Sequence, residues 1–322
     1  MNNILHKDSR IYIAGHRGMV GSAVKRKLER EGYDRLICRT SSELDLRNQK
    51  EVRSFFREEQ PEVVVDAAAR VGGIMANNEY PWQFLYENLE IQNNIIAAAH
   101  EQDVDKLIFL GSSCIYPKHA DQPMSEEALL TGPLEPTNQW YAIAKITGVK
   151  MVDALRRQYD RDYVSLMPTN LYGPNDNFDL KTSHVLPAMI RKFHDAKEKG
   201  HVPVPLWGTG SPMREFLHVD DAADAVFFTL NHTMEFDLYN VGTGKDIAIK
   251  DLALLVQDIV GHEGDINWDA TKPDGTPRKL MDVSRMEEAG WNYSVELEEG
   301  IRMTYEWFQE HQDEIKELKV EG

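Results

Sequence analysis

Tyr141 and Lys145 lie one helical turn apart in the segment Tyr141-Ala-Ile-Ala-Lys145. Residues four apart share one face of a helix, so the phenol and the ammonium can act on the same ligand. A nearby ammonium can lower the pKa of a tyrosine from its ordinary value of about 10, which helps the phenol pass a proton to a carbonyl oxygen. Ser112 follows a predicted strand and can hydrogen-bond that oxygen. The alternative is an exposed helical pair of residues that occurs by chance.

A glycine-rich loop near the N-terminus joins a predicted strand to a predicted apolar helix, and it reads Gly15-His16-Arg17-Gly18-Met19-Val20-Gly21. Three glycines at this spacing suit a tight turn, a close approach of the backbone to a pyrophosphate, and close packing of the helix on the strand. Free N–H groups at the start of the helix can receive phosphates. The G-x-x-G-x-x-G spacing in this context favours dinucleotide binding, and the alternative is a purely structural turn.

The second predicted strand ends in Arg39-Thr40, about twenty residues beyond the loop. NAD sites usually present a carboxylate to the ribose at this place. A guanidinium here, assisted by Arg17, suits the 2′-phosphate of NADP instead, so the sequence favours NADP(H) as cofactor. The alternative is that Arg39 lies at a solvated strand end while Glu43 or Asp45 reaches the ribose.

Short β-rich runs alternate with amphipathic stretches through the first half of the chain. We expect strands at 10–14, 36–39, 63–67, 107–111 and 163–168, and helices near 19–31, 48–58, 82–101 and 140–159. This alternation predicts an α/β fold, a Rossmann-type doubly wound parallel sheet. Ligands of such folds bind at the carboxyl ends of the strands, which is where the glycine loop and Ser112 are expected.

The pattern changes after residue 173, where Gly173-Pro174-Asn175-Asp176-Asn177 marks a turn. We expect an NADP-binding Rossmann domain over residues 1–173 and a smaller, interleaved mixed α/β domain over 174–322 that binds substrate. The runs 214–221 and 239–242 are strand- or turn-like. Segments near 215–244 are therefore expected to return to the first domain.

The composition limits the partners of the protein. A formal net charge of −17 would repel nucleic acid and anionic membranes, so we expect neither as a partner. The N-terminal sequence lacks an apolar signal core and no apolar run approaches the ~20 residues of a membrane span, which favours a cytoplasmic protein. With only Cys38 and Cys114, the chain predicts no disulfide framework, and we expect no metal site.

Further motifs cover nearly the whole chain and make it resemble the extended short-chain dehydrogenase/reductase family. Within that family it is most similar to enzymes that epimerise and reduce GDP-linked 4-keto-6-deoxy sugars. The motifs that carry the resemblance are the loop at 15–21, GSSCIYP at 111–117, EPTN at 135–138, YAIAK at 141–145, PTNLYGP at 168–174, WGTGSPMREFLHVDD at 207–221, NVGTG at 240–244 and KPDGTPRK at 272–279.

The resemblance implies two reactions in one site: epimerisation of GDP-4-keto-6-deoxy-D-mannose at C3 and C5, then hydride transfer from NADPH to C4, which gives GDP-L-fucose. A C4 ketone acidifies the hydrogens on both neighbouring carbons, and each inversion needs a base on one face and an acid on the other. The family implies Cys114 as base and His184 as acid, with Ser112, Tyr141 and Lys145 serving the reduction. From spacing alone, the alternatives are an inert buried thiol and a polar residue at a helix N-terminus.

The resemblance also implies the binding residues. The cofactor would contact Lys145, His184 and the ends of the fourth and fifth strands, namely Leu110, Gly111, Ser112, Ser113, Pro168, Thr169, Asn170 and Leu171. The GDP-sugar would contact Lys192, Trp207, Arg214 and Asp274. An acidic protein needs local cations to hold a diphosphate, and Lys272, Arg278 and Lys279 lie near these positions in the sequence. The alternative for each charged residue is a solvated surface position.

Apolar residues on more than one face of the helices near 82–101 and 140–159 indicate that these helices pack against a partner. The resemblance implies a homodimer that pairs these helices, as in related reductases.

Several rival functions remain. A nucleotide-sugar 4-epimerase would keep NAD bound, and a 4,6-dehydratase would have an acidic pair where Cys114-Ile115 stands. A non-catalytic NADP sensor would lack an intact Ser/Tyr/Lys set. Another 4-keto nucleotide sugar as substrate stays open.

Overall fold

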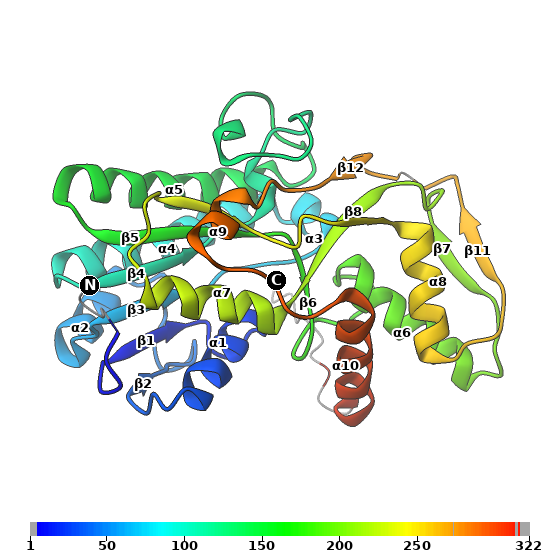
Figure 1. The fold of residues 1–322 in the computed structure, drawn as a ribbon, viewed down its shortest axis with the longest axis horizontal. Coiled ribbons are helices and arrows are strands. Elements are labelled where there is room, and N and C mark those ends of the chain that lie inside the picture. The colour runs from blue at the N-terminus through cyan, green and yellow to red at the C-terminus, as the bar shows by residue number, and fades with distance from the viewer. Residues whose placement is uncertain (1–4, 273, 313–314, 316–322) are drawn as a thin grey trace.

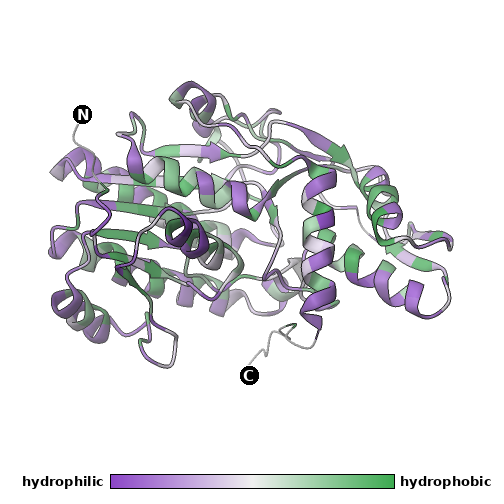
Figure 2. Ribbon diagram, turned by 60° about the horizontal axis from the view of Figure 1, so that its bottom comes forward, coloured by the Kyte–Doolittle hydropathy of each residue, from purple (hydrophilic) through white to green (hydrophobic). Residues whose placement is uncertain are grey.

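The computed structural model describes residues 5–272, 274–312 and 315. A six-stranded, wholly parallel sheet dominates one side of the molecule, in the order β2-β1-β3-β4-β5-β9 (Figure 1). Its strands are β1 Ile11–Ala14, β2 Leu36–Ile37, β3 Val63–Asp66, β4 Lys106–Leu110, β5 Asp162–Pro168 and β9 Leu238–Val241. Hydrophobic residues are concentrated along these strands (Figure 2), as expected for a parallel sheet covered on both faces.

Helices cover both faces of this sheet. One face packs against α1 Met19–Arg30 and α7 Val219–Asn231, and the other against α2 Gln49–Glu59, α4 Pro81–Glu101 and α5 Gln139–Tyr159. Local capping helps to set the bounds of the helices. The Asn48 side chain, for example, accepts hydrogen bonds from the backbone N–H groups of Lys50 and Glu51 and so caps α2. The strand order reverses between β1 and β3, which places the glycine loop at the crevice where such folds bind ligands.

Smaller sheets lie on the other side of the molecule (Figure 1). Strand β8 Met213–His218 pairs with β6 Asn170–Tyr172, β10 Asp246–Ala248 and β12 Arg278–Lys279, and β7 Val204–Trp207 pairs with β11 Ile266–Asp269. The core on this side is formed mainly by α6 Val185–Glu198, α8 Ile249–Val260 and α10 Leu297–Glu310. The remaining short helices are α3 Ile74–Glu79, η1 Ser113–Ile115, η2 Glu126–Ala128 and α9 Ser284–Ala289.

The buried side chain of Glu215 connects these parts. Its carboxylate accepts hydrogen bonds from the N–H groups of Thr243 (2.7 Å), Gly244 (2.8 Å) and Met281 (3.0 Å). Its backbone carbonyl accepts a hydrogen bond from the Asn170 side chain at 2.7 Å. One residue of β8 therefore fixes the segment after β9, the segment after β12 and the segment after β5.

The predicted α/β fold with a parallel sheet is confirmed. The nine predicted elements of the first half all occur, each within two residues of its expected bounds. The prediction for residues 214–221 was only partly correct, because β8 ends at His218 and α7 begins at Val219. The His218 ring caps that helix by accepting a hydrogen bond from the N–H of Asp220. The division of the chain at residue 173 stays a prediction.

Candidate active site

Tyr141 and Lys145 lie in the first two turns of α5, on the side that packs against the parallel sheet. Lys145 is 3 % exposed, and its Nζ donates a hydrogen bond to the carbonyl of Leu110 at the end of β4 (2.8 Å). Nζ also lies 4.6 Å from the centroid of the Phe109 ring and 5.9 Å from that of Tyr141. Lys145 is thus buried, and Tyr141 partly buried, near the carboxyl end of β4.

The effect of Lys145 on the pKa of Tyr141 stays a prediction, and in this structure other groups raise that pKa. Burial raises the pKa of Tyr141 above its ordinary value, and the negative charges of Cys114 and Asp66 raise it further. The ammonium of Lys145 hydrogen-bonds a backbone carbonyl and not the phenol. Tyr141 is therefore fully protonated at neutral pH, the state a proton donor requires.

Cys114 lies in η1, directly after β4, and is 7 % exposed. Its backbone N–H donates to the Ser112 hydroxyl at 3.4 Å, so the two residues form one tight turn. Burial raises the pKa of the Cys114 thiol, while the Lys279 ammonium, the Ser112 side chain and the Lys145 ammonium lower it. The charge of Cys114 also acts on Tyr141 and Lys145. Ser112, Cys114, Tyr141 and Lys145 therefore form one cluster.

His184 is the N-cap residue of α6, with extended backbone. His184 is exposed at the surface, but the protein atoms packed around its ring remove part of its hydration. This desolvation lowers the pKa of His184, and the positive charge of Lys279 lowers it further. His184 is thus neutral at pH 7. Lys279 acts on both His184 and Cys114, so all three belong to one electrostatic neighbourhood.

The glycine loop shows why glycine is required at two positions. A Cβ on Gly21 would lie 2.2 Å from the carbonyl oxygen of Gly15, and a Cβ on Gly15, where φ is +76°, would lie 2.6 Å from the carbonyl oxygen of Ala67. Gly18 caps α1 without a side-chain hydrogen bond, so the N–H groups at the start of that helix have no side-chain cap. The neighbouring His16 has a buried Nδ1 without a protein partner. These features fit the dinucleotide predicted to contact residues 15–21.

Arg39 is engaged within the protein. Its guanidinium forms an ion pair with Glu59, donates to the carbonyl of Cys38 at 2.9 Å and lies 5.5 Å from the centroid of the Phe55 ring. The carboxylate of Glu43 accepts hydrogen bonds from the N–H and the hydroxyl of Thr40. Arg39, the expected ligand of the 2′-phosphate, and Glu43, the alternative ligand of the ribose, therefore both lie just after β2.

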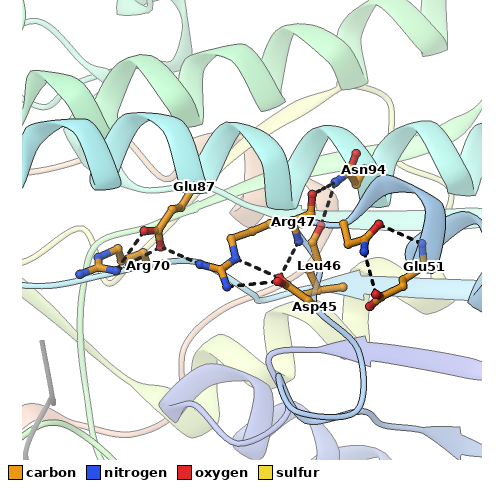
Figure 3. Close-up of polar contacts among 8 residues, drawn as sticks. Asp45, Leu46, Arg47, Glu51, Arg70, Glu87 and Asn94 are labelled. Carbon is orange, nitrogen blue, oxygen red and sulfur yellow. Dashed lines mark hydrogen bonds and ion pairs between the residues drawn. The ribbon is translucent and has the colours of Figure 1, made fainter. Parts of the chain in front are cut away.

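The other rival, Asp45, belongs to a chain of ion pairs (Figure 3). Arg47 contacts Asp45 at 2.9 Å and Glu87 at 3.9 Å, and Glu87 in turn contacts Arg70 at 3.1 Å. Asn94 of α4 donates to the backbone carbonyl of Arg47 at 3.1 Å. Asp45 thus helps to fasten the segment after β2 to α4, which accounts for its carboxylate without a ribose.

The segment after β5 forms a wall beside this edge of the sheet. Thr169 donates its N–H to the carbonyl of Val241 at 3.0 Å, and its hydroxyl lies 3.4 Å from the carbonyl of Glu215. Leu171 and Pro168 border a small apolar cavity, which is lined by Val20, Leu110, Leu166, Pro168, Leu171, Ala222 and Val241. Four of these seven residues, Val20, Leu110, Pro168 and Leu171, were expected to contact the cofactor.

The predicted substrate residues gather on β7, β8 and the segment before β12. Trp207 is 59 % exposed, with Lys272 Nζ 5.6 Å from its ring centroid. Arg214 is desolvated, which lowers its pKa, and the charge of Asp274 opposes this. Asp274 also accepts hydrogen bonds from the N–H and the hydroxyl of Thr209, at 2.6 and 2.8 Å. The ammonium of Lys192, on α6, donates a hydrogen bond to the backbone carbonyl of Pro205 at 3.0 Å.

Known proteins are similar to this chain over nearly its whole length. Residues 11–242 match the model of the NAD dependent epimerase/dehydratase family. The chain belongs to that family. It is 55 % identical over 308 residues to GDP-L-fucose synthase 1 of Arabidopsis thaliana, covering 96 % of this chain and 95 % of that protein. It is 53 % identical over 316 residues to GDP-L-fucose synthase of Escherichia coli K12, covering 95 % and 98 %.

Solved structures are also similar to this chain. A GDP-L-fucose synthetase from Naegleria fowleri bound to NADP is 27 % identical, with a TM-score of 0.87 and 96 % of each chain covered. A GDP-mannoheptose C4 reductase from Campylobacter jejuni with NADP bound is 39 % identical, with a TM-score of 0.87 and 95 % and 99 % covered. No helix in the described part of this chain is long and apolar enough to cross a membrane.

Sequence reasoning assigned no catalytic role to two residues whose charges reach the site, Lys279 and Asp66. Lys279 was expected only near the diphosphate, whereas its charge also reaches Cys114 and His184. Asp66, whose charge reaches Lys145 and Tyr141, was not singled out at all. Nothing in the sequence near either residue signals these contacts, because they arise from strand pairing.

Proposed function

We propose that this chain is a GDP-L-fucose synthase. It converts GDP-4-keto-6-deoxy-D-mannose to GDP-L-fucose by epimerisation at C3 and C5 and NADPH-dependent reduction at C4. The observation that carries the proposal is the cluster of Ser112, Cys114, Tyr141 and Lys145 in a chain that is 53–56 % identical to three proteins named as GDP-L-fucose synthases.

In the epimerisation, the Cys114 sulfur removes the hydrogen next to the C4 ketone, and His184 supplies a proton to the opposite face of the same carbon. The ammonium groups of Lys279 and Lys145 favour the thiolate and so oppose the effect of burial. The Cys114 thiol then releases its proton to solvent and His184 takes one up, after which the same two proton transfers at the second carbon complete both inversions. Desolvation lowers the pKa of His184, so most of it is neutral at pH 7 and the cationic fraction is the form that donates the proton. That fraction is a stronger acid because of the same desolvation.

In the reduction, NADPH supplies the hydride for C4 when it is bound. Tyr141 gives its phenolic proton to the C4 oxygen, and the Ser112 hydroxyl donates a hydrogen bond to that oxygen. Lys145 binds the hydroxyls of the nicotinamide ribose. The raised pKa of Tyr141 keeps its proton available at neutral pH until negative charge develops on the C4 oxygen.

For the cofactor, we propose that residues 15–21 hold the pyrophosphate and that Arg17 and Arg39 bind the 2′-phosphate of NADP(H). Arg39 would then exchange part of its contact with Glu59 for the phosphate. Residues 168–171 face the nicotinamide. For the substrate, we propose that Lys192 and Arg214 hold the diphosphate, that Trp207 packs on the base or sugar, and that Asp274 accepts hydrogen bonds from it.

We also propose the predicted homodimer, in which two copies pair α4 and α5. These helices expose large side chains near their N-terminal ends, with Trp82 64 % and Tyr86 42 % exposed and their rings stacked at 4.8 Å. Trp140 and Ile143 of α5 are 38 % and 39 % exposed. Sedimentation of the wild type and of Trp82→Glu would test the pairing, and a wild-type monomer would contradict it.

The test of the function mixes the purified protein with NADPH and GDP-4-keto-6-deoxy-D-mannose, follows the absorbance of NADPH, and identifies the product by NMR. Oxidation of NADPH with formation of GDP-L-fucose is the expected result. Oxidation with retained configuration at C3 and C5 would instead indicate a C4 reductase. Tight binding of NADPH without oxidation would indicate a different 4-keto nucleotide sugar.

A further inference from the structure

Asp66 is a buried carboxylate that the proposed reaction does not use. It is the last residue of β3, is 0 % exposed, and Oδ1 accepts one hydrogen bond, from the N–H of Ala68 at 3.2 Å. Oδ2 has no hydrogen-bond partner and is closed off from solvent. Burying an ionised carboxylate with so few partners is costly, so its presence calls for a nearby compensating charge.

The register of the sheet places Asp66 next to Phe109, whose ring the ammonium of Lys145 approaches. Asp66 pairs with Phe109 across β3 and β4, which puts the two side chains on the same face, on strands about 4.8 Å apart. Lys145 Nζ lies 4.6 Å from the centroid of that Phe109 ring. Helix α5 lies directly on the ring, since a Cβ on Gly148 would be 2.3 Å from Phe109 Cζ. The ammonium therefore stands above the immediate neighbour of Asp66.

We propose that Asp66 is a positioning residue for Lys145, a role that rests on the proposed function: its carboxylate is the counter-ion that keeps the buried ammonium charged and in place for the nicotinamide ribose. Lys145 needs such a partner, because the group that accepts a hydrogen bond from its ammonium is the neutral carbonyl of Leu110. Cys114 carries a second negative charge near Lys145, but only when its thiol is deprotonated. Asp66 supplies a charge that does not depend on the catalytic thiol.

The charges around Asp66 act in consistent directions. On α5, Asp66 raises the pKa of Lys145 against the effect of burial, and it raises the pKa of Tyr141. On β1, it raises the pKa of Tyr12. Burial raises the pKa of Asp66 to about 6 while Lys145 lowers it, so the carboxylate is ionised at pH 7 to 8. Loss of the Asp66 charge should therefore lower the pKa of Lys145.

The experiment measures the affinity of the protein for NADPH, by fluorescence, from pH 6 to pH 10.5. In the wild type, affinity falls at alkaline pH as Lys145 loses its proton, and Lys145→Met identifies this transition by lacking it. In Asp66→Asn, the transition should move to lower pH. The affinity for adenosine 2′,5′-bisphosphate, which has no nicotinamide ribose, should be the same in both proteins at each pH.

Ser165→Ala is the matched control variant. Ser165 pairs with Phe109 on the side opposite Asp66, and its hydroxyl is likewise buried without a partner, but it has no charge. This variant should leave the alkaline transition in place. Asp66→Leu repeats the loss of charge without introducing an amide, in case Asp66→Asn does not fold.

An unmoved alkaline transition in the folded Asp66 variants would overturn the proposal. So would an equal loss of affinity for NADPH and for adenosine 2′,5′-bisphosphate, which would show general damage to the fold. Failure of the proposed function looks different. A wild type that makes no GDP-L-fucose, but whose NADPH affinity depends on Asp66 as described, would refute the function and leave the role of Asp66 standing.

Discussion

Replacement of Asp66 by asparagine should make the protein more stable at neutral pH, and this change should depend on pH in a defined direction. Burial raises the pKa of Asp66 from its ordinary value of 3.8 to about 6. Between these values the native state holds a proton that the unfolded state has released. The contribution of Asp66 to the free energy of unfolding therefore falls as pH rises from about 4 to about 6 and does not recover above it.

The size of this effect follows from the shift in pKa. Each pKa unit corresponds to about 1.4 kcal/mol, so a shift of about 2 units corresponds to about 3 kcal/mol. Because Asp66 is 0 % exposed, solvent does not screen this contribution. Asparagine does not titrate. The free energy of unfolding of Asp66→Asn minus that of the wild type should thus rise by about 3 kcal/mol between pH 4 and pH 7.

The assay is urea unfolding followed by circular dichroism at several pH values between 4 and 8, at one ionic strength. Asp121→Asn, which removes an exposed carboxylate, is the control variant. A flat difference for Asp66→Asn would refute the reasoning, since it would mean that Asp66 has the same pKa in the folded and unfolded protein. A difference that falls with pH would show that Asp66 stabilises the fold as an ion.

Other perturbations test the remaining parts of the site. Cys114→Ser should slow exchange of solvent deuterium into C3 and C5 by about 10²-fold or more while NADPH affinity is kept, and unchanged exchange measured by NMR would remove Cys114 from the epimerisation. Tyr141→Phe should slow oxidation of NADPH by about 10²- to 10⁴-fold while exchange at C3 and C5 continues, which stopped-flow absorbance can follow. Alkylation of Cys114 by iodoacetamide should have its midpoint above the pH typical of an exposed cysteine, because burial raises its pKa, and Lys279→Met should move the midpoint higher still. Gly148→Ala should destabilise the protein by about 1 to 3 kcal/mol in urea, since the new methyl group overlaps the Phe109 ring, and full stability would show that α5 can shift.

The elements of the first half could be predicted because their signals are local. Alternation of β-rich and amphipathic segments indicates the parallel sheet, and the rule that ligands lie at carboxyl ends of strands brings Ser112 near Tyr141. Helix α3 was not predicted. It has only six residues, and its place is fixed from elsewhere, by the hydrogen bond from the N–H of Gly73 to the carbonyl of Thr182.

The residues of the site that could not be predicted depend on contacts between distant segments. Lys279 lies opposite Arg214 through the pairing of β12 with β8, a register that no nearby residue encodes. Asp66 ends the apolar run Val63-Val-Val-Asp66, which looks like an ordinary buried strand. Its relation to Lys145 appears only when β3, β4 and α5 are packed together.

The position of β9 at the edge of the parallel sheet affects synthesis of the protein on the ribosome. Strand β9 hydrogen-bonds β5, as in the bond from the N–H of Thr169 to the carbonyl of Val241, yet it begins about 70 residues after β5 ends. At about 5 to 20 residues per second, translation takes about 4 to 14 seconds to cross this interval. During that time the nascent chain presents β5 as an unpaired edge, open to strands of neighbouring nascent chains. A slow codon or a pause between residues 169 and 241 would lengthen this exposure and favour aggregation without changing the stability of the finished protein.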